Sequence, residues 1–314
     1  TGNWQLETDN DRMFPSLLLV TILAAAQSGA DSRSPNTDQT VPVARGARLT
    51  VDDFAGEVVI RAWGRDAVRV QAKHMPRTRV SVETTSSGVA ISASGMRGPA
   101  SAVDYEISVP AWMPVKVDGT YAFITVEGTE SEIAAETVRG DIRIKGGAVA
   151  ISAETIDGSI LVEGAKGRIT ASSVNQGIRI NGASGDIAAE TTNSSIVLTG
   201  ISSETVDVGS VNGSLTYDGT PAPHGRYRFS THNGRIAVAV AETAGAVFNV
   251  RTYHGSMQTN LPLQGGGDVS RGRRGVFTLG GGGAEFDLES FGGTIHIRRT
   301  GTLPAAALKE KSKN

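Results

Sequence analysis

The sequence predicts an all-β solenoid, and three observations lead to that fold class. First, one phrase returns at a constant spacing, as TVRGDI at 137–142, TIDGSI at 155–160, SVNQGI at 173–178 and TTNSSI at 191–196. Second, apolar residues two apart follow each copy, which is the pattern of a strand with one buried face. Third, amphipathic helical stretches are nearly absent, whereas 39 glycines suit a chain that turns every few residues. Such a fixed period is typical of coils that bury their apolar faces only against neighbouring coils.

The repeat extends over nine coils when Gly140 is taken as the anchor position. The anchors are Gly140, Gly158, Gln176, Ser194, Gly213, Gly234, Gly255, Gly275 and Gly293. Each coil therefore has a length of about 18–21 residues, within the range of known solenoid repeats. A second strand precedes each anchor, as at 151–155 and 187–191, so we expect two short strands and two tight corners in each coil. We expect the coils to stack in chain order. A β-sandwich is the main alternative, although it rarely keeps identical spacing with identical residue types.

Upstream of the regular repeat, the same pattern continues with longer steps. Apolar residues fit one coil at 115–126, another at 80–91 and a third at 49–60. Additional strands are expected at 68–70 and 105–109. We interpret 46–127 as an elaborated cap with the first coils, because an open end of the stack would expose strand edges. Residues 128–299 are then the regular solenoid.

The terminal segments predict an exported protein. Residues 1–12 precede Met13 and are expected to be upstream or added residues. Residues 13–26 resemble a signal peptide, because the apolar stretch is too short to span a membrane and ends in Ala24-Ala25-Ala26. A buried N-terminal helix is the alternative. Residues 27–45 have the composition of a linker. Residues 300–314 form a polar, basic tail without a C-terminal membrane anchor.

Composition excludes several classes of function. A net charge of −2 over 314 residues is not that of a nucleic-acid-binding protein. The absence of cysteine excludes disulfides, thiol catalysis and cysteine-based zinc sites. We expect no cofactor.

Two polar rows recur at the corners. The residue before the anchor is often Asn, in the series Asp157, Asn175, Asn193, Asn212, Asn233 and His254. Stacked Asn side chains can bond from coil to coil, so a structural ladder is expected, and a row that binds sugar hydroxyls is the alternative. Three residues before the anchor stands a hydroxyl, in the series Thr137, Thr155, Ser173, Thr191, Ser210, Thr231, Thr252 and Ser290. Such hydroxyls commonly bond to neighbouring backbone. Eight equivalent hydroxyls argue against any single nucleophile.

Two clusters of titratable side chains have catalytic or metal-binding potential. His232, Tyr253 and His254 come together at two corners near Arg251, where ring stacking between coils is expected and an acid–base pair for polysaccharide cleavage is the alternative. Glu136, Glu154 and Glu190 occupy equivalent outward positions. They could hold calcium or act as a glycosidase pair, but a solvated face neutralised by Arg143 and Arg179 is expected instead. The sequence thus assigns no catalytic, cofactor or metal residue.

The segment FAGEVVIRAWGRDAVRV at 54–70, the strand end ISVP at 107–110 and the repeated TVxGDI unit resemble a family of bacterial β-strand-repeat proteins. This family groups putative adhesins around a domain of unknown function, and the resemblance covers most of 46–299. It implies an exported or envelope-associated β-solenoid and supplies no catalytic residues. We therefore expect a non-enzymatic binding or scaffold module that meets a glycan or envelope polymer along its lateral face, in the periplasm, cell envelope or outside the cell. A carbohydrate-active enzyme on a β-helix and a spacer without a ligand are the alternatives.

Overall fold

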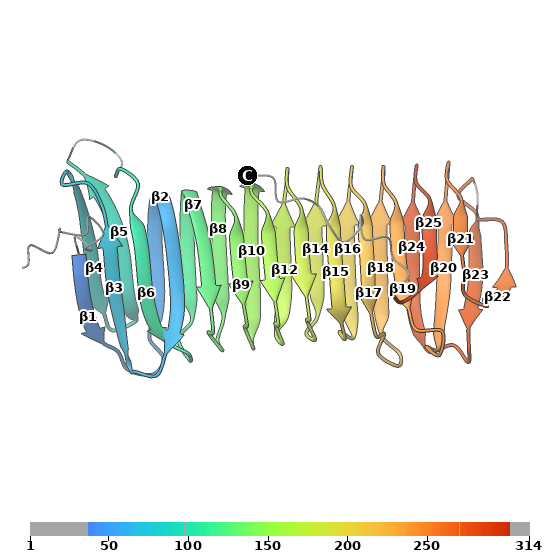
Figure 1. The fold of residues 1–314 in the computed structure, drawn as a ribbon, viewed down its shortest axis with the longest axis horizontal. Helices are drawn as coiled ribbons and strands as arrows, with labels where there is room; N and C mark the ends of the chain where they lie inside the picture. The colour runs from blue at the N-terminus through green and yellow to red at the C-terminus, as the bar shows by residue number, and fades with distance from the viewer. Residues whose placement is uncertain (1–36, 97, 99, 270, 302–314) are drawn as a thin grey trace, which may run out of the picture. The chain divides into compact units, whose positions relative to one another are not determined.

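The computed structural model describes residues 37–96, 98, 100–269 and 271–301. The predicted signal peptide, residues 1–12, the linker up to 36 and the tail from 302 lie outside the described residues. Within the described residues the chain forms 25 strands and no helix, in one long, mostly parallel, open sheet that winds as a solenoid (Figure 1). The predicted fold class is confirmed.

Each regular coil contributes one strand to each of two layers. Layer 1 contains β8 (Ile133–Arg139), β10 (Ala150–Asp157), β12 (Arg168–Ser173), β14 (Ile187–Thr191), β16 (Thr205–Ser210) and β18 (Arg226–Thr231). Layer 2 contains β9 (Ile142–Lys145), β11 (Ile160–Glu163), β13 (Ile178–Asn181), β15 (Ile196–Ile201), β17 (Leu215–Gly219) and β19 (Ile236–Val240). Corner 1 is the turn from layer 1 to layer 2 within a coil, such as 156–159. Corner 2 is the turn to the next coil, such as 164–167.

Strand register follows the sequence period. Ile160 lies between Ile142 and Ile178 on parallel neighbouring strands. Side chains alternate between the core and the outside along each strand, so the repeated isoleucines and alanines of the two layers meet in one continuous core. In the C-terminal coils, buried aromatic side chains replace the smaller residues, and Tyr217 contacts the rings of Tyr227, Phe229 and Phe286.

The predicted hydroxyl row is buried in layer 1 and bonds to backbone. Thr155 and Ser173 donate from their hydroxyls to the carbonyl oxygens of Gly140 and Gly158, one coil back, at 3.3 and 3.0 Å. The same bond joins Thr191 to Gln176, Ser210 to Ser194 and Thr231 to Gly213. The structural interpretation of this row is confirmed for these five residues, because each hydroxyl ties its coil to the previous one.

At the N-terminal end, the first long strand lies inside the cap. The strands here are β1 (Thr37–Pro42), β2 (Arg48–Trp63), β3 (Ala67–Lys73), β4 (Thr78–Thr85), β5 (Gly88–Gly95), β6 (Asp104–Pro110) and β7 (Val115–Glu127). Both β2 and β7 pass through corner 1 and belong to both layers. β2 pairs with β7 on one side and with β5 and β6 on the other, so later strands cover an earlier one.

Two predictions for this end are wrong. Residues 37–42, assigned to the linker, form β1, which pairs antiparallel with β3. Residues 80–91, assigned to a coil, belong to the antiparallel hairpin of β4 and β5. Alternating apolar residues look the same in a hairpin and in a parallel coil, so the sequence pattern does not separate them. The antiparallel strands close the ends of the parallel stack.

At the C-terminal end, the coils do not follow chain order. The strands are β20 (Ala246–Thr252), β21 (Met257–Thr259), β22 (Gln264–Gly266), β23 (Arg274–Leu279), β24 (Ala284–Ser290) and β25 (Ile295–Arg299). β24 pairs with β18 and β20, and β25 pairs with β19 and β21. The last coil in the sequence is therefore inserted between its two predecessors, as the red strands among the orange ones show (Figure 1). The expected stacking in chain order fails here.

The anchor assigned to Gly275 is also wrong. Gly275 lies in β23, which runs antiparallel to β20 and pairs with β22. This hairpin covers the edge of β20, which the parallel stack would otherwise leave open. At each end of the solenoid, the coil that is first or last in the sequence thus lies inside the stack, and antiparallel strands cover the outer edge.

Candidate functional site

At corner 1, successive anchor residues pack closely against each other along the stack. A Cβ atom at Gly158 would lie 1.8 Å from the carbonyl oxygen of Gly140. The equivalent distance at Gly213 is 1.6 Å, to the carbonyl oxygen of Ser194. Glycine is required at these two positions by close approach rather than by an unusual φ. The tight turn brings equivalent side chains of neighbouring coils into register along the edge.

The predicted Asn ladder runs along corner 1. Asn193 donates from Nδ2 to Oδ1 of Asn175, and Asn212 donates in the same way to Asn193, both at 3.2 Å. Asn233 donates to Asn212 at 3.1 Å. The prediction is confirmed for these four residues. At the ends it differs, because Asp157 pairs with Arg139 and the inserted coil places Gly292 rather than His254 beside Asn233.

An exposed apolar row lies beside the Asn ladder. It occupies the position one residue earlier in each coil, and backbone hydrogen bonds join these corners from coil to coil. Val138, Ile156, Val174, Val211 and Phe291 are 38–50% exposed, although they are large and apolar. We call the following set the corner-1 stripe: Val138, Ile156, Val174, Thr192, Val211, His232, Phe291 and Tyr253. Eight coils at about 4.8 Å per step make it roughly 34 Å long.

Aromatic rings gather at the C-terminal end of the stripe. His232 stacks on Phe291 with ring centroids 4.6 Å apart, and Tyr253 packs on Phe291 at 5.2 Å. His254 meets the edge of the same ring at 5.0 Å. The predicted ring stacking between coils is confirmed. The predicted direct contact of His232 with Tyr253 is wrong, because the inserted coil places Phe291 between them. The proposed acid–base pair is separated by an apolar ring.

A second aromatic group lies near the N-terminal end of the stripe. Phe54 and Tyr121 meet edge to face at 5.6 Å, and the guanidinium of Arg139 lies 5.9 Å from the centre of the Tyr121 ring. Phe123 is more than half exposed. A cavity of about 470 Å³ adjoins these rings, and its lining includes Gly56, Glu57, Asp104, Tyr121, Phe123, Thr125, Asp141 and Arg143. Three carboxylates and one guanidinium give this cavity a negative character.

A buried carboxyl group lies in the same part of β2. Asp53 is 1% exposed, and neither carboxyl oxygen has a partner within hydrogen-bonding geometry. Loss of water on burial raises the pKa of Asp53 to about 7. The nearby backbone amide of Ala55 lowers this pKa, and the negative charges of Asp104 and Asp52 raise it further. The buried hydroxyl of Tyr105 also has a raised pKa, first because of burial and then because of Asp53.

The predicted glutamate row lies on the outer side of layer 1, two residues before the corner-1 stripe on each strand. Glu136 and Glu154 are directly opposite each other, and Ser172 separates Glu154 from Glu190. Arg143 and Arg179 belong to layer 2, so the predicted neutralisation is wrong, because corner 1 turns the following strand into the other layer. Arg143 instead lies 3.7 Å from Asp141. Within the described ranges, no three His, Asp or Glu side chains are grouped as a metal site.

Sequence reasoning missed the exposed stripe and the aromatic group at 54, 121 and 123. The signal for the stripe was present, because Val138, Ile156 and Val174 recur with the same period as the phrase around them. This period was interpreted only for the neighbouring position, which forms the Asn ladder. The aromatic group had no such signal, because Phe54 and Tyr121 are far apart in the sequence and meet only through the pairing of β2 with β7.

No family model matches the sequence, and no curated protein is similar to it in sequence. Two solved structures are similar to this chain. One is a putative cell adhesion protein from Clostridium sporogenes, with 11% identity and a TM-score of 0.24, covering 85% of this chain and 100% of its own. The other is a putative adhesin from Parabacteroides merdae, with 8% identity and a TM-score of 0.36, covering 83% and 95%. Similarity at this level supports no functional assignment. Among the described residues, no helix has the length and apolar character needed to cross a membrane.

Proposed function

We propose that this chain is an exported, non-enzymatic binding module that holds an extended neutral polysaccharide along the corner-1 stripe. The observation that carries this proposal is the corner-1 stripe, in which five of eight coils expose a large apolar side chain, on an edge with aromatic rings near both ends. Contiguous exposed apolar surface commonly marks an interaction site. The sugar rings of a polysaccharide present apolar faces that pack on such side chains.

The geometry favours a long ligand over a small one. Equivalent groups repeat about every 4.8 Å, so a polymer makes many weak contacts at once and gains avidity from their number. The three carboxylates of the cavity near Phe123 disfavour an acidic polymer at that end. Phe291 keeps His232 and Tyr253 apart, which argues against polysaccharide cleavage at the other end. Export is inferred from residues 13–26, outside the described residues.

The test is retention of the purified chain on insoluble cellulose, chitin and a neutral β-glucan. A triple variant Val138→Ser, Ile156→Ser, Val174→Ser removes the three apolar side chains at the N-terminal end of the stripe without touching the core. A matched triple variant on the outer side of layer 1, Glu136→Ser, Glu154→Ser, Glu190→Ser, is the control. We expect at least tenfold weaker retention for the stripe variant and little change for the control. Equal retention of the stripe variant and the unaltered chain, or no retention on any of the three polymers, would overturn the proposal.

A further inference from the structure

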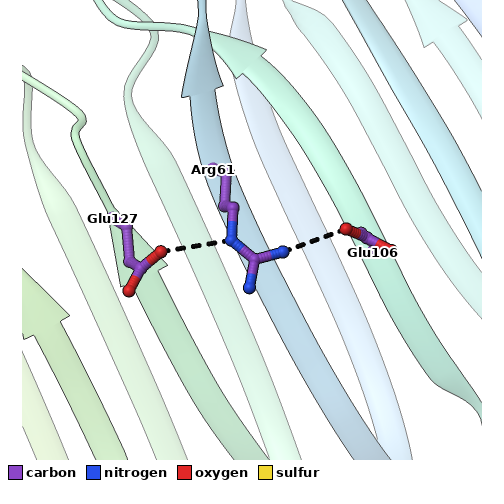
Figure 2. Close-up of polar contacts among 3 residues, drawn as sticks. All are labelled: Arg61, Glu106 and Glu127. Carbon is purple, nitrogen blue, oxygen red and sulfur yellow. Dashed lines mark hydrogen bonds and ion pairs between the residues drawn. The ribbon is translucent and has the colours of Figure 1, made fainter.

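A row of charged side chains near corner 2 alternates in sign from coil to coil. Strand pairing places each member directly opposite the next on the outer side of layer 2, about 4.8 Å apart. We call these residues the charge ladder: Arg61, Glu127, Lys145 and Glu163. Figure 2 shows its first members, where Arg61 lies 3.1 Å from Glu127 and 2.9 Å from Glu106. The side chains of Arg61 and Glu127 remain about half exposed, at 50% and 43%.

Glycines leave open space beside the charge ladder. Gly128, Gly146 and Gly164 directly follow Glu127, Lys145 and Glu163, and they have φ angles of +77°, +98° and +66°. This left-handed conformation favours glycine, so no side chains project here. A cavity of about 580 Å³ results, lined by the charge ladder, these glycines and Ala62. Side chains from another molecule could enter this space.

We propose that the charge ladder and its glycine-lined cavity bind a second copy of this chain. A two-fold axis parallel to the strands, between Glu127 and Lys145, reverses the order of the coils in the partner. Arg61 then faces the partner's Glu163, and Glu127 faces the partner's Lys145. Every ladder position meets the opposite charge, and each contact occurs twice, as a two-fold interface requires.

The neighbouring row of outward side chains on layer 2 lies two residues earlier on each strand, and it is compatible with the same axis. It contains Glu106, Val59, Thr125, Arg143, Leu161 and Arg179, in spatial order. Reversal places Glu106 opposite the partner's Arg179, and Val59 opposite the partner's Leu161. Thr125 faces the partner's Arg143. No like charges meet, and an apolar pair lies at the centre of each half.

Other arrangements of two copies are disfavoured by the same charges. An axis along the stack would place each ladder residue opposite its own copy, with four like-charge contacts. Moving the proposed axis by half a coil, onto Lys145, would place Lys145 against the partner's Lys145 and Glu127 against the partner's Glu163. The ladder is neutral as a whole, with two charges of each sign, so it offers little attraction to a polymer of one sign. Like-charge contacts therefore disfavour these arrangements, and among whole-coil shifts the proposed axis pairs the largest number of opposite charges.

Mixing two single variants tests this pairing between molecules. Glu127→Lys places lysine against the partner's Lys145, and Lys145→Glu places glutamate against the partner's Glu127, so each variant should repel its own copy. A mixture of the two variants restores opposite charges at every ladder position of a heterodimer. This recovery cannot arise within one molecule, where each variant keeps its unfavourable neighbours. Sedimentation velocity of the full chain at about 0.05 M and about 0.5 M NaCl measures the association.

We expect a dimer of the unaltered chain that weakens with salt, at least tenfold weaker association for each variant, and recovery in the 1:1 mixture. Glu190→Lys, which makes the same charge change on layer 1, should leave association unchanged. Melting curves confirm that the variants are folded. A monomeric unaltered chain, full association of either single variant, or a mixture no better than its components would each overturn the proposal.

Discussion

Ser290 donates a hydrogen bond from Oγ to the backbone carbonyl oxygen of Gly234, 56 residues earlier, at 3.1 Å. This is the bond that Thr231 makes to Gly213 in the preceding coil. Thr252 in turn donates to Gly293 at 3.4 Å. The hydroxyl row therefore follows the stack in space rather than the chain. Because the last coil makes the same bonds as its neighbours, it fits between two earlier coils.

Replacing Ser290 should destabilise the inserted coil. Its Oγ also accepts a hydrogen bond from the backbone amide of Gly293 at 2.9 Å, so Ser290→Ala removes two partly buried bonds. We expect a loss of about 1–3 kcal/mol in the free energy of unfolding, measured by urea denaturation. Ser230→Ala, at an exposed position on β18, is the control and should change stability by less than about 0.5 kcal/mol. Equal stability of the two variants would contradict the role of the hydroxyl.

A side chain at Gly293 should be tolerated even less. A Cβ atom there would lie 1.7 Å from the carbonyl oxygen of Gly234. Gly293→Ala must push two coils apart, so we expect a loss of about 3 kcal/mol or more in a melting experiment. Gly281→Ala is the matched control, because a Cβ atom there has no neighbour within 4 Å. Comparable melting of both variants would show that the two coils are not in contact.

The sequence predicts the stack well but not the order of its last coils. The constant period correctly places Ile142, Ile160 and Ile178 side by side. The coils at 252–257 and 290–295 carry the same hydroxyl and the same anchor glycine. Either coil could therefore form the bonds that β18 and β19 offer. Spacing alone does not separate two interchangeable neighbours. In the structure the coil at 290–295 takes this place, and Phe286 packs against Tyr217 and Tyr227.

The corner-2 features were readable from sequence but were overlooked. Glu127-Gly128, Lys145-Gly146 and Glu163-Gly164 recur with the same period as the phrase at corner 1. Their residue types change from coil to coil, however, and the alternation in charge has meaning only when Arg61 is known to precede Glu127 in space. That neighbour comes from β2, 66 residues away. Long-range pairing of this kind leaves no periodic trace.

The Asn ladder should act in stability rather than in binding. Asn193 donates to Asn175 and accepts from Asn212, so Asn193→Ala breaks two links of the ladder. Both bonds are exposed, so we expect a loss of about 1 kcal/mol and a fall of about 2–4 °C in melting temperature. Retention on the polysaccharide that binds the unaltered chain should not change. Gln258→Ala, an exposed amide on β21, controls for loss of an amide group. Unchanged melting with lost retention would assign the ladder to the binding surface.

The buried carboxyl of Asp53 should make the folded chain more stable as pH falls from about 8 to about 4. Its pKa in the folded state is about 7, above the ordinary value of 3.8, so folding favours the protonated form. Above pH 7 the folded state must bury a charge, whereas between pH 7 and 4 it takes up a proton that the unfolded chain does not bind. Each pH unit in this window is worth about 1.4 kcal/mol, so the contribution reaches roughly 4 kcal/mol at most.

Urea denaturation across this range should show the trend in the unaltered chain and lose it in Asp53→Asn. Asp207→Asn, at an exposed carboxylate on β16, should retain the trend. The same pH dependence in both variants would mean that Asp53 is charged in the folded state, with a partner or water that stabilises its carboxylate.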